Sequence, residues 1–494
     1  MPRADRKAAV AGCGEGGVGE WGDGEGGVEG GWVMYQDYVR RKLLSVPPTG
    51  IAKVPDLDFG MFPHQAALTR WALSRGRCAI FADTGLGKSR MQIAWADTVH
   101  RMCGHDVLIL APLAVAAQTS AEGAAVGVRV KHCHDGSEVE AGITITNYDR
   151  LHRFDTRRFG AIVLDESSII KHHTAKTLQV LIEAFRSTPF KLCATATPAP
   201  NDWTELGTHA EFLGICTRAE MLAEYFCHDG GETQVWRLKG HARSAFWRFV
   251  AGWGAMVRKP SDLGFDDSLY NLPPLQVHEH HVATSAVATS GMLFALEAET
   301  MSERRDARRA SLDQRVVACA ERVNASADPW VVWCDLNAEG DALRKAIPDA
   351  VEIRGSDDTD DKEQRLTEFA AGKIRVLVTK PSIAGWGLNW QHCHSMAFVG
   401  VTDSFEAYYQ AVRRCWRFGQ RNPVQVHIFA SELEGAIVSN LKRKERDATA
   451  MAEALSAETR AAVQSEVLGS VRQTNTYNPA ARIATPAWLK TEVA

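Results

Sequence analysis

Short apolar runs, rich in β-branched residues, alternate with longer helix-like segments in two parts of the chain. The first series occupies 78–84, 106–112, 143–148, 161–167 and 191–198, and the second occupies 330–335, 350–355, 374–380, 395–400 and 424–430. Runs that are apolar throughout are typical of parallel strands buried on both faces, and the intervening segments are long enough for crossover helices. The pattern therefore predicts two tandem α/β lobes, each with a parallel sheet flanked by helices.

Changes in composition set the predicted domain boundaries. Residues 1–33 are dominated by Gly and Glu, with little to bury, so we expect a disordered tail. We hypothesise that Met34 is the true start or that the tail is dispensable. The remaining predicted segments are a first lobe at 34–201, an irregular helical insert and linker at 202–328, a second lobe at 329–445, and a charged helix with a polar tail at 446–494.

The bulk composition is that of an ordinary soluble protein, with 45% hydrophobic and 23% charged residues. The net charge of −4 excludes a polycation, so any nucleic-acid site must be a local basic surface. The 11 cysteines are scattered and odd in number, which favours reduced thiols over a disulfide framework. We find no apolar span of membrane length and no signal peptide, and therefore expect a cytoplasmic protein.

The segment FADTGLGKSRMQ follows a predicted strand and precedes a predicted helix. Its glycines allow the backbone to turn N–H groups towards a phosphate, and the helix start adds a positive dipole end. Lys88 would reach the β- and γ-phosphates of ATP, and Ser89 would offer its hydroxyl to Mg²⁺. The alternative, a glycine-rich turn with an incidental lysine, fits this strand, loop and helix order less well. The predicted nucleotide-binding residues of the loop are Thr84, Gly85, Gly87, Lys88 and Ser89.

An acidic pair ends the predicted strand in AIVLDESS. Asp165 would hold Mg²⁺ through its water shell, and Glu166 would orient the attacking water. Such a pair is common at strand ends, but here it follows a phosphate loop with one further strand between them. Thr195 and Thr197, in the next strand end CATATP, are placed to sense the pair and the γ-phosphate. The alternative for that segment is a strand that simply ends in a proline turn.

Upstream, Gln65 has an amide that can read the two polar edges of adenine. The order Gln65, GLGKS, APLAV, TNYDRL, DESS and TATP resembles the first-lobe motifs of a superfamily-two helicase. LVTKPSIAGWGLNWQ and YYQAVRRCWRFGQRNPV are similar to the last two motifs of its Swi/Snf-related branch, and DESS and RKPSDLG resemble helicase-like proteins of tailed phages and prophages. The resemblance covers about residues 40–445. It implies two RecA-like lobes that bind ATP and Mg²⁺ in the cleft between them.

Arg414 and Arg417 of the second lobe are spaced one helical turn apart, so we expect them on one face of a helix. An arginine from outside the phosphate loop can stabilise the charge of a γ-phosphoryl transition state, which makes both candidate catalytic residues. The alternative, a solvated basic helix, is disfavoured by the aromatic residues beside them. Further residues predicted to bind the nucleotide are Gln410, one turn before Arg414, and Gly385 and Gly387, which would let a tight loop approach the cleft.

The resemblance also implies that the phosphates of one nucleic-acid strand lie across both lobes. The residues implied to contact them are Pro112, Asn147, Lys171, Thr379 and Lys380. Phosphate contacts carry no sequence information, so we expect little sequence preference. The aromatic and basic stretch at 236–259 could add base-stacking contacts, but the helical spacing of its aromatic residues favours core packing.

The resemblance implies an ATP-dependent translocase on duplex DNA, which we expect to act as a monomer, in the bacterial host cytoplasm if a phage encodes it. One alternative is a helicase that separates DNA or RNA strands, and another is an ATP-gated scaffold in a replication or recombination complex. The presence of Lys88, Asp165 and Glu166 argues against the scaffold. Ser167–Ser168 replaces the usual Ala-His of the acidic box, and the shorter reach of serine weakens the expected coupling of hydrolysis to lobe movement.

Overall fold

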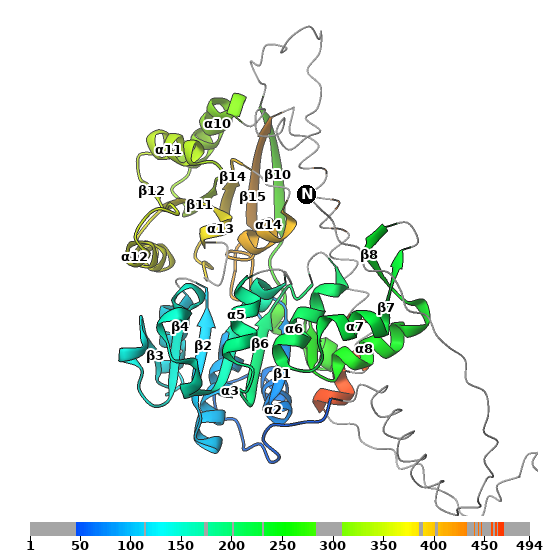
Figure 1. The fold of residues 1–494 in the computed structure, drawn as a ribbon. Helices are drawn as coiled ribbons and strands as arrows, with labels where there is room; N and C mark the ends of the chain where they lie inside the picture. Colours follow the sequence, from blue (N-terminus) through cyan, green and yellow to red (C-terminus); the bar gives the residue numbers. More distant parts are fainter. Residues whose placement is uncertain are drawn as a thin grey trace, which may run out of the picture. The chain divides into compact units, whose positions relative to one another are not determined.

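The computed structural model describes residues 46–112, 115–171, 176–199, 202–229, 232–282, 309–384, 389–400 and 404–431, with scattered positions between 439 and 468. These residues all belong to one compact unit, Val46–Ala494. Two parallel sheets dominate it, and helices flank them (Figure 1). The chain therefore contains two RecA-like lobes in tandem, as the alternation of apolar runs predicts.

The first sheet has seven parallel strands in the order β3-β4-β2-β5-β6-β1-β9. Its strands are β1 (Arg77–Ala82), β2 (Asp106–Ala111), β3 (Val130–His132), β4 (Ile143–Asn147), β5 (Phe159–Asp165), β6 (Phe190–Thr195) and β9 (Gly254–Val257). The helices of this part are α2 (Pro63–Arg75), α3 (Lys88–Cys103), α4 (Val115–Ala124), α5 (Lys176–Ala184), α6 (Leu206–Leu213), α7 (Arg218–Tyr225) and α8 (Arg243–Ala251). Because the strands are parallel, the loops that follow β1, β5 and β6 meet at one edge of the sheet.

The second sheet has six parallel strands in the order β10-β15-β14-β11-β13-β12. Its strands are β10 (Leu275–Val282), β11 (Trp330–Trp333), β12 (Ala350–Glu352), β13 (Val376–Thr379), β14 (Ser395–Phe398) and β15 (Val424–Ser431). Its helices are α10 (Leu312–Asn324), α11 (Asn337–Ala346), α12 (Thr359–Ala370), α13 (Pro381–Ala384) and α14 (Phe405–Val412). Trp333 stacks on Trp390 and on Phe398 in the core, with ring centroids 5.8 and 6.3 Å apart.

The segment 202–328 differs from the predicted helical insert, because it supplies a strand to each sheet. β9 pairs with β1 at one edge of the first sheet, and β10 pairs with β15 over its full length. Neither strand has the long apolar run on which the prediction depends. A separate antiparallel hairpin, formed by β7 (Phe226–Asp229) and β8 (Glu232–Leu238), also lies in this segment (Figure 1).

The aromatic stretch of the same segment packs into the core, as its helical spacing favours. Phe246, Trp247 and Trp253 are at most 3% exposed. The ten cysteines in the described ranges are free thiols. No helix in that part of the chain is long and apolar enough to cross a membrane.

Candidate active site

The phosphate loop joins β1 to α3 and has the backbone shape that its sequence predicts. Gly85 and Gly87 have φ angles of 89° and 82°, in the left-handed region that favours glycine. A Cβ on Gly87 would also clash with the amide of Gln65, so a larger residue there would displace the Gln65 side chain. Lys88 begins α3, and its Nζ donates to the carbonyl of Ala82 at 2.9 Å. Burial lowers the pKa of Lys88, while the Glu166 and Asp83 carboxylates oppose that shift.

The acidic pair lies where β5 ends. Gln92 Nε2 donates to Asp165 Oδ1 at 2.6 Å, and the Tyr148 hydroxyl donates to the Asp165 carbonyl at 2.7 Å. Burial and the adjacent Glu166 charge raise the pKa of Asp165 to about 6. Glu166 has a φ of 51° and is the only non-glycine residue with positive φ in the described ranges. Backbone strain of this kind is often found at functional positions.

A chain of hydrogen bonds connects Glu166 with the second lobe. The Thr195 hydroxyl donates to Glu166 Oε2 at 3.3 Å and accepts from the Thr197 N–H at 3.2 Å. Gln410 Nε2 on α14 donates to Thr197 Oγ1 at 3.4 Å. Arg414 Nη2 in turn donates to Gln410 Oε1 at 2.9 Å. Thr195 and Thr197 therefore lie between the acidic pair and the arginine segment. We call this chain of hydrogen bonds, from Glu166 to Arg414, the threonine relay.

The two predicted arginines do not share a helix face. Helix α14 ends at Val412, and Arg414 and Arg417 lie in the turns that follow it. The backbone N–H of Trp390 donates to the Arg414 carbonyl at 2.9 Å, so a tertiary hydrogen bond takes the place of a helical one. Arg414 is buried, and Arg417 is half-buried. Burial and the charge of Arg414 lower the pKa of Arg417 to about 9, so an anion beside them would relieve their mutual repulsion.

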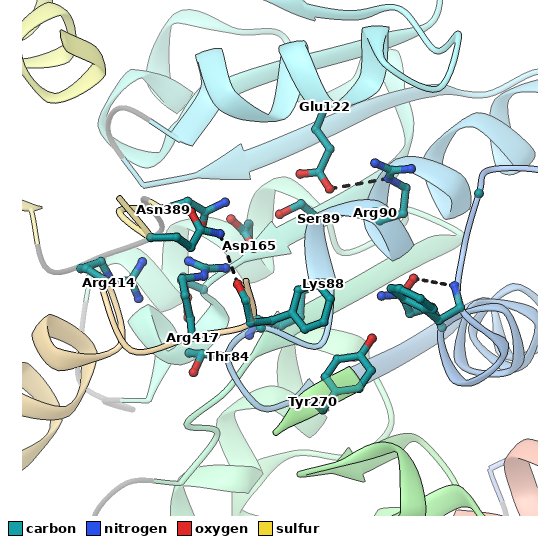
Figure 2. A pocket seen from close by; sticks show the side chains of 18 residues that line it. Thr84, Lys88, Ser89, Arg90, Glu122, Asp165, Tyr270, Asn389, Arg414 and Arg417 are labelled. Atoms are coloured by element: carbon teal, nitrogen blue, oxygen red, sulfur yellow. Dashed lines mark hydrogen bonds and ion pairs between the residues drawn. The ribbon is translucent and has the colours of Figure 1, made fainter. Parts of the chain in front are cut away.

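These groups surround one cavity of about 250 Å³, lined by residues of both lobes (Figure 2). The lining residues are Gly60, Phe62, Gln65, Thr84, Gly85, Gly87, Lys88, Ser89, Arg90, Glu122, Asp165, Glu166, Tyr270, Asn389, Gln391, Arg414, Arg417 and Phe418. Gly385 and Gly387 lie outside the described residues. Gln410 is fully buried behind Arg414 and is absent from the lining. The cavity thus combines phosphate-binding, acidic and arginine side chains.

Several lining residues were missed by the sequence analysis. Arg90 pairs with Glu122 of α4 at 3.6 Å, and Tyr270 and Phe418 place their rings 4.9 Å apart. Arg90 directly follows the GKS motif and Phe418 directly follows Arg417, so both could have been proposed from position. Glu122 and Tyr270 come from segments with no motif, and only the fold brings them to the cavity.

The Gln65 amide is held inside the protein rather than free for a ligand. Its Oε1 accepts from the Phe62 N–H at 3.0 Å, and its Nε2 donates to the Leu86 carbonyl at 3.0 Å. Gln65 therefore ties the start of α2 to the phosphate loop. An amide has a second N–H and a second lone pair, so the capacity to recognise a base remains.

The residues of the cavity suit a magnesium nucleotide. Mg²⁺ usually takes only one or two carboxylates from the protein and completes its shell with water and phosphate oxygens. Ser89 and Asp165 are the side chains that could hold it. Within the described ranges, no group of three or more His, Cys, Asp or Glu residues could hold a metal by itself. The donor set therefore fits an ion that arrives with phosphates.

A second cavity, of about 490 Å³, contains three of the residues that the resemblance implies for nucleic acid. Pro112, Asn147 and Lys171 line it, together with second-lobe residues such as Lys362. Lys171 forms an ion pair with Glu406 of α14. Glu166 lines both cavities and therefore links them.

Thr379 and Lys380 do not line this second cavity. Thr379 is fully buried, and its hydroxyl donates to the Ile353 carbonyl at 3.2 Å. Its side chain therefore cannot reach a phosphate in this conformation, which corrects the expectation from sequence. The motif position was right for a strand end, but the alternation of the strand turns this side chain inward.

Comparison with known families agrees with this geometry. Residues 321–419 match the family model described as helicase conserved C-terminal domain. The second lobe carries a helicase C-terminal domain. The matched region includes Gln410, Arg414 and Arg417, and it supports a helicase-type, nucleic-acid-dependent ATPase in general. No curated protein shows significant sequence similarity to the chain.

Proposed function

We propose that this chain is an ATP-dependent DNA translocase of the Swi/Snf-related kind, which moves along duplex DNA as a monomer with little sequence preference. The observation that carries the proposal is the meeting of a phosphate loop, an acidic pair and two arginines in one cavity of about 250 Å³. The helicase C-terminal domain supports it, because it contains those arginines.

The proposed hydrolysis uses the residues of the cavity as follows. Lys88 and the loop N–H groups bind the β- and γ-phosphates. Ser89 and Asp165 would hold Mg²⁺, which neutralises phosphate charge when bound. Glu166 orients the attacking water and accepts its proton. The guanidinium groups of Arg414 and Arg417 stabilise the negative charge of the transition state.

The second cavity is the proposed nucleic-acid site. Lys171 and Lys362 provide positive charge for the phosphates, and Asn147 also lines this cavity. Because Glu166 lines both cavities, a strand bound there would lie close to the residue that orients the water. The threonine relay from Glu166 to Arg414 supports the coupling of that event to the second lobe.

The decisive experiment is steady-state ATP hydrolysis without nucleic acid and with single-stranded DNA, duplex DNA and RNA. Lys88→Ala should abolish turnover, while Lys53→Ala, at an exposed lysine outside both cavities, should not change it. Stimulation by duplex DNA supports the translocase. Stimulation by single strands or RNA alone supports a strand-separating helicase, and no turnover under any condition supports the ATP-gated scaffold.

A strand-separating helicase is the second candidate, and the β7–β8 hairpin is the observation that favours it. This antiparallel pair lies outside both main sheets, and Arg237 on β8 is exposed. A projecting hairpin can act as a wedge between strands. If the chain displaces streptavidin from biotinylated duplex but does not unwind a fork, the translocase proposal stands. If it unwinds the fork with ATP, the strand-separating helicase takes the place of the translocase.

A further inference from the structure

Asp83 of the phosphate loop is bonded to both lobes. Its Oδ1 accepts from the Thr84 N–H at 2.6 Å and from the Tyr409 hydroxyl at 2.8 Å. Its Oδ2 accepts from Arg413 Nη2 at 3.4 Å. Tyr409 lies on α14, and Arg413 caps the carboxyl end of that helix. One carboxylate thus connects the phosphate loop with the end of the helix that precedes the catalytic arginines.

Arg413 is held in place by more than this ion pair. Its guanidinium carbon lies 5.0 Å from the centroid of the Tyr409 ring and 4.5 Å from that of the Trp416 ring. The side chains of Arg413 and Asp83 are only 12% and 20% exposed. Burial works against the charge of Asp83, but Arg413 and Tyr409 outweigh it and hold the pKa of that carboxyl below its usual range. A shielded charge pair with aromatic contacts has a defined geometry.

A second contact joins the same two segments. A Cβ added to Gly85 would lie 2.9 Å from the backbone nitrogen of Phe418, so the backbones of the phosphate loop and the arginine turn approach closely. Arg413 and Phe418 stand on either side of Arg414 and Arg417 in the sequence. The turn that carries the catalytic arginines is therefore fixed to the phosphate loop at both of its ends.

We propose that Asp83, Tyr409 and Arg413 form a clasp between the lobes that positions Arg414 and Arg417 for catalysis before nucleotide binds. The proposal rests on the proposed ATPase function. The clasp residues are absent from the lining of the nucleotide cavity, so they are positioning residues rather than catalytic ones. Their effect is on where the arginines lie when the transition state forms.

The clasp predicts a particular kinetic pattern. Groups that act in the transition state affect kcat, whereas uniform binding of substrate affects KM. Loss of the clasp should leave the phosphate loop able to bind ATP but should misplace the arginines. A misplacement of about 1 Å costs up to roughly a hundredfold in rate, and partial loss should cost about tenfold.

The test is a double-mutant cycle with Asp83→Asn and Arg413→Gln. Each single variant should lower kcat about tenfold with little change in KM, and the double variant should be no worse than either, because one interaction is removed in all three. Arg248→Gln, at an exposed arginine of α8, is the matched control. Unchanged kcat, or effects that multiply in the double variant, would overturn the clasp. If either variant fails to fold, Tyr409→Phe removes a single hydroxyl and should give a smaller fall in kcat alone.

A second readout separates failure of the clasp from failure of the proposed function. Small-angle X-ray scattering of the nucleotide-free chain requires no turnover. Asp83→Asn and Arg413→Gln should increase the radius of gyration relative to the wild type and to Arg248→Gln. An unchanged radius in both variants argues against the clasp even if the chain hydrolyses ATP, and an increased radius supports it even if hydrolysis is absent.

Discussion

Replacing Glu406 with glutamine removes the carboxylate that pairs with Lys171 beside the second cavity. The two side chains are 10% and 16% exposed, so solvent screens the pair less than it would at an open surface. A nucleic-acid phosphate that binds Lys171 has to take the place of this carboxylate. We therefore expect Glu406→Gln to tighten nucleic-acid binding.

The size of the effect follows from the strength of the pair. A partly buried, hydrogen-bonded ion pair contributes about 1–2 kcal/mol. This energy no longer opposes binding in the variant, so the affinity should rise about 5- to 30-fold. Lys171→Ala should weaken binding instead, and it should reduce the slope of log affinity against log salt by about 0.9, because one phosphate contact is lost. Glu406→Gln should leave that slope unchanged, since Lys171 remains.

Fluorescence anisotropy of a labelled duplex, titrated at several salt concentrations, measures both quantities. Asp360→Asn is the control, because it removes another ion pair between the lobes, with Arg150 at 3.4 Å, and does not line the second cavity. If Asp360→Asn tightens binding as much as Glu406→Gln, loosening of the lobes explains the effect and the phosphate site does not. An unchanged salt slope in Lys171→Ala would refute the contact itself.

Three further predictions concern the nucleotide cavity. Asp165 has to be ionised to hold Mg²⁺, so kcat/KM for ATP should fall as the pH drops through about 6, and a flat profile down to pH of about 5 would contradict this role. Gly87→Ala should lower the melting temperature, because its φ of 82° costs an alanine about 1–2 kcal/mol and its Cβ meets Gln65. Thr195→Val should retain basal hydrolysis but lose stimulation by nucleic acid, because the variant lacks the hydroxyl that bonds Glu166. Equal stimulation of the wild type and of Thr195→Val would exclude the threonine relay.

Much of the fold was predictable because strands that are buried on both faces have a strong sequence signal. Each apolar run of both series overlaps a strand of the structure, and the loop that follows β1 has the predicted shape. β9 and β10 were missed for physical reasons. β9 has four residues, and β10 is a half-exposed edge strand whose sequence, LQVHEHHV, lacks an apolar run.

The candidate site was predictable only where one short segment carries both the residue and its position. Lys88 and Asp165 follow directly from the ends of their strands. Arg414 lines the cavity but lies in a turn rather than in the expected helix, because the bond from the Trp390 N–H to its carbonyl is a tertiary feature. Glu122 reaches the cavity through the packing of α4, which no local pattern encodes.

The serine pair of the acidic box need not uncouple hydrolysis from lobe movement. The Ser167 hydroxyl lies 3.1 Å from Nε2 of His209, a buried histidine of α6. Burial lowers the pKa of His209 to about 4. Because both residues belong to the first part of the chain, this contact does not reach the second lobe. Two other routes connect the acidic pair and the phosphate loop with α14 of the second lobe. The threonine relay reaches Glu166 through Gln410, and the clasp reaches the phosphate loop through Asp83.

Both routes begin in one short segment of the second lobe, because Tyr409 and Gln410 are neighbours on α14 and Arg413 caps that helix. A movement of α14 that breaks the bond to the phosphate loop must also disturb the bond to Thr197. The segment therefore contacts the phosphate loop through Asp83 and reaches Glu166 through the threonine relay. We expect this linkage to transmit hydrolysis to the lobes without a histidine in the acidic box, so that Ser167→Ala changes stimulation by nucleic acid far less than Thr195→Val.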